Sequence, residues 1–179
     1  YSGNFGEAHE FSEFLALARA LRQNENIHFC FAIRGNQAEA FRKAVTTDDI
    51  NISFAPFAKI EDLEKRLNSA DIHLVSLKEN WAGLAVPSKF FGSLASAKPI
   101  LYSGSKKSAI GTWITQHKIG RTIDPNNISQ TVDWIEKLAK EPSNLLELQR
   151  HCHSLYQAQF SRRSVIERWD KELKMLLGE

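Results

Sequence analysis

The segment from Gly83 to Lys89 carries residue types that could hold an anion. Pro87 suits the first position of a helix, where the missing N–H of proline would have no partner in any case. The backbone amides of Ser88 and Lys89 then lack intrahelical partners, and the helix dipole adds about half a positive charge at the same end. With the Ser88 hydroxyl and the Lys89 ammonium as further donors, the segment predicts a diphosphate site. The alternative is a purely structural helix start with a solvated lysine.

Short apolar stretches alternate with amphipathic segments along the chain. Apolar residues that recur every three or four positions predict helices, and the nearly unbroken apolar run at 71–77 is typical of a strand covered on both faces. We therefore predict an α/β fold, a doubly wound Rossmann-like parallel sheet of about six strands with helices on both faces and extra C-terminal helices. The expected strands are a first one ending near residue 3, then 27–33, 50–54, 71–77, 100–102 and 121–123. The expected helices are 8–22, 37–45, 60–68, 87–97, 108–117, 128–140, 145–159 and 161–177, the last with Ser161 as its N-cap.

Ligands bind to such sheets at the carboxyl ends of the strands, near the point where the strand order reverses. Five loops meet this condition. They are residues 3–6, 34–36, 55–57, 78–89 and 103–109.

Composition limits the classes of function. A chain of 179 residues with 42% apolar residues fits one domain, and a net charge of +2 with interspersed signs gives no reason to expect a nucleic-acid partner. Cys30 and Cys152 lie far apart, which argues against a disulfide framework and favours a reducing, cytoplasmic setting. No apolar run reaches the roughly 18 residues of a membrane span. The full-length protein could still contact the inner face of a membrane peripherally. Because the chain begins at Tyr1 without methionine, we expect a fragment cut at a domain boundary.

The run at 86–100, VPSKFFGSLASAKPI, resembles the donor-site helix of family 4 (group 1) glycosyltransferases of the GT-B fold. Residues 1–6 are similar to the first strand and glycine loop of their C-terminal domain, and residues 70–75 to the strand before the donor loop. Residues 120–125 are similar to the last strand, so the resemblance covers nearly the whole chain in the expected order. It implies that residues 1–179 form one nucleotide-sugar-binding domain, the C-terminal half of an enzyme whose N-terminal acceptor-binding domain is absent.

The resemblance also implies an activity. Such an enzyme transfers a sugar of hexosyl or N-acetylhexosaminyl type from a nucleotide diphosphate sugar, here expected to be UDP-linked, to a glycan or lipid-linked acceptor. No metal or other cofactor is expected, and the isolated domain is expected to be inactive because most acceptor contacts belong to the other half. Lys89 is the expected catalytic residue, since its charge would stabilise the leaving diphosphate.

The resemblance and the loop positions together select the expected site residues. Those expected to bind the donor diphosphate are Gly3, Asn4, Gly6, Arg34, Gly83, Leu84, Ser88, Lys89 and Gly92, and those expected at the nucleotide base are Pro56 and Phe57. Two positions depart from the family pattern. Gly92 stands where members often carry a glutamate that holds the ribose, and Asn4 and His9 stand where arginine and lysine are common.

These departures leave two other functions open. A non-catalytic nucleotide-sugar-binding or assembly module with a decayed donor site is the first alternative. A sugar-nucleotide epimerase, which uses the same architecture, is the second, but we find no convergent set of carboxylates and histidines for it.

Three further groups of residues have simpler interpretations. His151, Cys152 and His153 are adjacent on an expected helix and therefore point in different directions, which favours a solvated face over a metal site. Lys106 and Lys107 are expected in a solvated loop. The basic residues of the last helix are expected on an ordinary exposed face, with a missing domain or an anionic membrane as alternatives. They are Arg162, Arg163, Arg168, Lys171 and Lys174.

Overall fold

The computed structural model describes residues 1–57, 59–126 and 128–178. Over these residues six strands form two parallel three-stranded sheets with the orders β1-β2-β3 and β4-β5-β6. The strands are β1 (Ser2–Asn4), β2 (Phe29–Arg34), β3 (Ile52–Phe54), β4 (His73–Ser76), β5 (Ile100–Ser103) and β6 (Gly120–Thr122). The predicted α/β class, the parallel strands and the strand count are confirmed.

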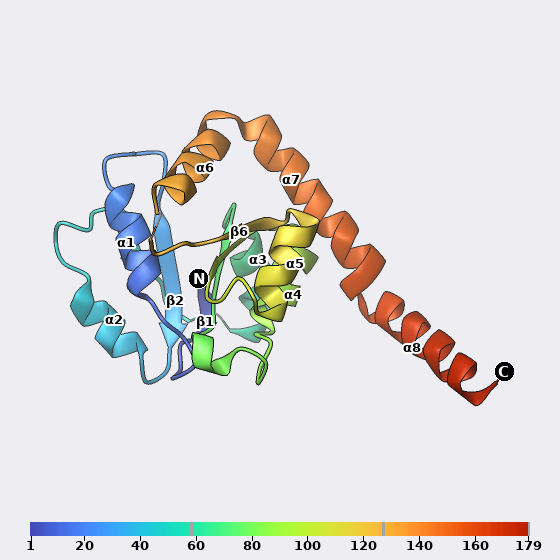
Figure 1. Cartoon of the computed structure of the whole chain (residues 1–179). Coiled ribbons are helices and arrows are strands. Elements are labelled where there is room, and N and C mark those ends of the chain that lie inside the picture. The colour runs from blue at the N-terminus through green and yellow to red at the C-terminus, as the bar shows by residue number, and fades with distance from the viewer. Residues whose placement is uncertain (58, 127, 179) are drawn as a thin grey trace.

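Helices connect the strands and continue after β6 (Figure 1). They are α1 (Ser12–Ala20), α2 (Ala38–Ala44), α3 (Leu63–Asn68), α4 (Lys89–Ala95), α5 (Ala109–His117), α6 (Ser129–Lys140), α7 (Pro142–Leu155) and α8 (Arg162–Leu177). A π-helical turn at Tyr156–Phe160 separates α7 from α8. Ser161 caps α8 as predicted, because its hydroxyl oxygen accepts a hydrogen bond from the Ser164 amide.

Two apolar clusters form the core, and the first of them contains side chains from both sheets, such as Phe31 of β2 with Leu74 of β4. Phenylalanines from β2 and from the helices beside it fill the first core, with Phe31 and Phe41 in edge-to-face contact at 4.6 Å. The second core joins α4, α5 and β5 to α7, through residues such as Phe90, Tyr102 and Cys152. The side chains buried at each sheet are therefore those with the apolar periodicity in the sequence.

Contacts between loops join the two sheets where β1 and β4 end. The Lys78 amide donates to the Ala8 carbonyl at 2.9 Å, and Nδ1 of His9 donates to the Ser76 carbonyl at 2.8 Å. Burial lowers the pKa of His9, so its imidazole is neutral at neutral pH. The loop after β1 is thus fixed against the end of β4, the position at which open α/β sheets bind ligands.

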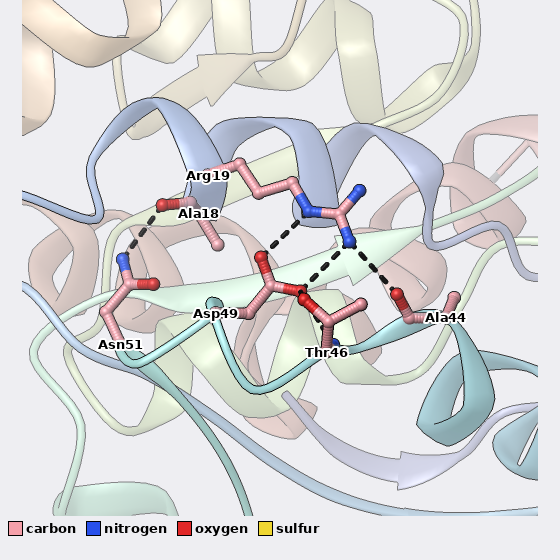
Figure 2. Close-up of polar contacts among 6 residues, drawn as sticks. All are labelled: Ala18, Arg19, Ala44, Thr46, Asp49 and Asn51. Atoms are coloured by element: carbon pink, nitrogen blue, oxygen red, sulfur yellow. Dashed lines mark hydrogen bonds and ion pairs between the residues drawn. The ribbon is translucent and has the colours of Figure 1, made fainter.

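A buried polar network at the opposite end of the strands ties α1 to the α2–β3 connection, as Figure 2 shows. The Asp49 carboxylate, 1% exposed, accepts from Nε and Nη2 of Arg19 at 2.8 and 2.9 Å and from the Thr46 amide at 2.9 Å. Arg19 also donates to the Ala44 carbonyl, and Asn51 to the Ala18 carbonyl. The hydrogen bonds from Arg19 hold the pKa of Asp49 well below its usual range.

The last helix leads away from the rest of the domain (Figure 1). No residue of α8 among those described is buried, although Ile166, Trp169, Leu173 and Leu176 follow one another at intervals of three and four. This spacing places the four apolar side chains on one face of the helix. None of the described helices combines the length and the apolar character needed to cross a bilayer.

Candidate functional site

A cavity of about 790 Å³ lies beside β1 and β2 and extends to α3 and the start of α4. Polar groups from the ends of several elements meet in its wall. Seven of the residues selected from the sequence line it, namely Gly3, Asn4, Arg34, Phe57, Ser88, Lys89 and Gly92.

Four of the selected residues lie outside the lining of this cavity. Gly6 follows Asn4 in the loop after β1, and Pro56 is exposed beyond β3. Gly83, with a φ of 85°, and Leu84, which is 79% exposed, lie in the loop before α4. The roles of all eleven selected residues stay predictions, and seven of them now share one cavity.

Lys89 lies across the end of β1. Its Nζ donates to the Asn4 carbonyl at 3.2 Å and lies 5.1 Å from the centre of the Tyr1 ring. Gly3 has a φ of 140°, and a Cβ built there would lie 2.5 Å from Cε of Lys89. The glycine therefore makes room for the lysine side chain, and the two elements meet because position 3 has no side chain.

The Lys89 ammonium has no acidic partner in the described part of the chain. Among the described residues no carboxylate lies within ion-pair distance of Nζ, and burial lowers the pKa of Lys89. A partly buried cation without a counter-ion is electrostatically unfavourable, and an anion bound beside it would remove that cost.

Backbone donors lie next to this ammonium. The Phe90 amide donates to the Pro87 carbonyl and the Gly92 amide to the Ser88 carbonyl. Within the described part of the chain no acceptor is found for the amides of Ser88 and Lys89, and no side chain caps the helix. Since α4 is only seven residues long, these local donors matter more than the dipole of the whole helix.

Aromatic packing fixes α4 from behind. Phe90 is fully buried, and its ring lies 5.2 Å from that of Trp113 and 5.6 Å from that of Phe160. Phe160 belongs to the π-helical turn after α7, so the C-terminal helices support the helix that presents Lys89. Rigid support of this kind keeps donors in place without a ligand.

A histidine holds α4 from the cavity side. Nδ1 of His73 lies 2.9 Å from Oγ of Ser93, and Nε2 lies 2.8 Å from the Leu67 carbonyl. Burial lowers the pKa of His73 to about 4, so the imidazole is neutral at neutral pH. It bridges α3 and α4 at the start of β4, which is a structural role.

Arg34 and Phe57 form the wall at the ends of β2 and β3. The Arg34 guanidinium lies 4.2 Å from the centre of the Phe57 ring, within the range of a cation–π contact. Gly35 follows with a φ of 118°, and a Cβ there would lie 2.8 Å from the Phe5 carbonyl oxygen. Only glycine fits this turn, which directs the chain away from the loop after β1.

Several lining residues were not selected from the sequence. Cys30 lines the cavity from β2, and Lys59 and Arg66 line it from the segment around α3. That segment reads from the sequence as an ordinary connecting helix. Its place at the cavity depends on tertiary packing, so no local signal identifies these side chains.

The other polar motifs have local partners. His151 and His153 are exposed as predicted, and Nε2 of His151 donates to the His117 carbonyl at 2.7 Å. Cys152 was predicted on the same solvated face but is buried in the second core, with its thiol 3.7 Å from the Ile119 carbonyl. Lys106 and Lys107 are exposed in the loop before α5, as predicted, and Lys106 also forms an ion pair with Asp124 at 2.8 Å. Among the described residues no three His, Cys, Asp or Glu side chains gather as metal ligands would.

Solved structures share this fold. The C-terminal domain of the glycosyl transferase group 1 family protein LpcC from Francisella tularensis matches with a TM-score of 0.68 at 15% identity, over 89% of this chain and 85% of that one. A TarM mutant of S. aureus, crystallised in complex with Fondaparinux, alpha-GlcNAc-glycerol and UDP, matches with a TM-score of 0.72 at 13% identity, over 94% of this chain and 34% of that one. The chain therefore has the fold of the C-terminal domain of GT-B, group 1 glycosyltransferases, as the resemblance predicted.

A particular relative supports the same class by sequence. The chain is 29% identical to the probable glycosyltransferase WbjE of Pseudomonas aeruginosa over 184 aligned residues. The alignment covers 100% of this chain and 44% of that protein, so the chain spans less than half of the relative. No family model matches the sequence.

Proposed function

We propose that this domain binds the donor of a glycosyltransferase, a nucleotide diphosphate sugar that is UDP-linked. One observation carries the proposal: among the described residues the Lys89 ammonium has no carboxylate partner, and it lies beside two amides at the start of α4 for which no acceptor is found. Paired phosphates fit this set of donors, because their charge satisfies the ammonium and their oxygens accept from the amides. The UDP in the TarM crystal structure supports the choice of nucleotide.

The proposed reaction places Lys89 at the leaving group. As the bond between the sugar and the diphosphate breaks, negative charge grows on the phosphate oxygens. A fixed ammonium therefore stabilises the transition state more than the ground state. Arg34 is positioned to add a second positive charge at the cavity wall. The transferred sugar is of hexosyl or N-acetylhexosaminyl type, the acceptor is a glycan or lipid-linked glycan, and no metal takes part.

The remaining part of the enzyme is an N-terminal half that binds the acceptor. The relative WbjE is long enough to contain such a half, since this chain covers 44% of its length. The exposed apolar face of α8 is a surface on which such a half would pack. The isolated domain then binds the donor without turnover.

Isothermal titration of the domain with UDP and with uridine tests this function. UDP is expected to bind at least tenfold more tightly, because only UDP carries the phosphates that Lys89 and the amides of α4 would hold. The affinity for UDP should also fall with rising salt, as it does for charge-dominated binding. Equal affinities for the two compounds, or no heat with either at millimolar concentration, would exclude a diphosphate site.

A module with a decayed donor site is the second candidate, favoured by Gly92 and Asn4 at positions that often carry charged residues. It predicts that UDP and uridine behave alike. The same titration therefore separates the two functions.

A further inference from the structure

Every charged side chain in the cavity wall is a cation. Within the described lining these residues are Arg34, Lys59, Arg66 and Lys89, and neither Asp nor Glu is among them. Asp62, three residues after Lys59, lines an adjoining pocket instead. The wall is therefore rich in donors for phosphate and offers no carboxylate to a hydroxyl group.

Gly92 marks a place in this wall where a side chain has room. It lines the cavity one helical turn after Ser88 and Lys89, and thus on the same face of α4. A Cβ built on Gly92 meets no atom within 4 Å outside its own helix and neighbours. The wall therefore has no side chain at position 92, beside the proposed phosphate donors.

Ribose is the part of a nucleotide that this arrangement leaves without a strong partner. In dinucleotide-binding Rossmann folds an Asp or Glu carboxylate accepts a hydrogen bond from the ribose 2′-hydroxyl, and its charge strengthens that bond. The side-chain oxygens in the described lining are neutral, and they include those of Asn4 and Ser88. Binding energy then comes from the phosphates and the base.

We infer that Gly92 makes the site indifferent to the ribose 2′-hydroxyl, so that 2′-deoxyribonucleoside diphosphates and their sugars bind as well as the ribonucleotides. This inference rests on the proposed donor site. It goes beyond that proposal by extending the substrate class to deoxyribonucleotide-linked sugars.

Titration of the domain with UDP and 2′-deoxy-UDP tests the inference, because the two ligands share base and phosphates. The dissociation constants are expected to agree within about twofold, whereas a charged hydrogen bond to the 2′-hydroxyl would give a preference of roughly tenfold or more for UDP. Such a preference would overturn the inference and leave the donor site intact. Failure of both ligands to bind would overturn the proposed function together with the inference.

Two variants locate the effect at position 92. Gly92→Glu places a carboxylate in the open space and is expected to raise the preference for UDP over 2′-deoxy-UDP to about tenfold. Gly92→Ala is the matched control, since it adds a side chain and helix propensity without a carboxylate, and its ratio should stay near one. If circular dichroism shows both variants folded and Gly92→Glu still does not discriminate, the assignment to Gly92 is wrong.

Discussion

Replacing Lys89 by methionine is expected to weaken UDP binding by about 5- to 150-fold. The loss corresponds to about 1–3 kcal/mol, the range for a hydrogen bond to a charged group. Methionine keeps an unbranched side chain that can still lie over Gly3, so the change removes the ammonium with little effect on packing. Isothermal titration at fixed ionic strength measures the difference.

The control for this substitution is Lys137→Met. Lys137 is exposed on α6 and does not line the cavity, so its replacement removes one positive charge without touching the site. Its effect on affinity should be less than twofold at moderate salt, because exposed charges farther apart than about 10 Å are largely screened. Equal losses for the two variants would mean that Lys89 acts only through net charge, and no loss for Lys89→Met would favour the decayed module.

Asp49→Asn is expected to lower the free energy of unfolding by about 2–4 kcal/mol, the largest stability change that we expect from a single polar substitution. The buried carboxylate accepts from Arg19 and Thr46, and an amide would turn two donors toward them in place of one acceptor. The charge on Arg19 would then lose its partner. Urea denaturation at neutral pH measures the change.

The neighbouring residue provides a matched control. Asp48 is exposed, and Asp48→Asn should change the free energy of unfolding by no more than about 0.5 kcal/mol. Because the network lies at the amino ends of the strands, folded Asp49→Asn protein should bind UDP as the unchanged domain does. A stability loss no larger than that of Asp48→Asn would show that the network of Figure 2 contributes little.

The order and type of the elements could be predicted from the sequence because apolar periodicity reports them locally. The bounds of the helices were less predictable, since they depend on individual contacts. The first helix was predicted from residue 8, but α1 begins at Ser12, where the Glu10 carboxylate accepts from the amides of Phe11 and Ser12. The α4 helix ends at Ala95, two residues earlier than predicted, and Ala97 beyond it has a left-handed φ of 56°.

The division of the strands into two ladders was not predictable in the same way. The sequence indicates one open sheet, but no backbone ladder joins β1 to β4 in the described residues. Contacts such as that between His9 and Ser76 connect the two sheets instead. His9 and Ser76 are 67 positions apart, and local patterns carry no information about such pairs.

The candidate site was predictable to the extent that its signals are local. Pro87 marks a helix start, and this places Ser88 and Lys89 from sequence alone. That Lys89 rests on Gly3, and that Gly92 faces open space, are consequences of packing between distant segments. Cys30, Lys59 and Arg66 enter the wall for the same reason.

The most direct test of the proposed site is a titration of ¹⁵N-labelled domain with UDP, followed through the backbone amide signals. The amides of Ser88 and Lys89 should show the largest shifts, with smaller shifts at Gly3 and Asn4, because the paired phosphates are proposed to bind at these donors. Saturable binding that leaves the Ser88 and Lys89 signals unchanged, with the shifts elsewhere in the domain, would contradict the proposal that the start of α4 holds the diphosphate.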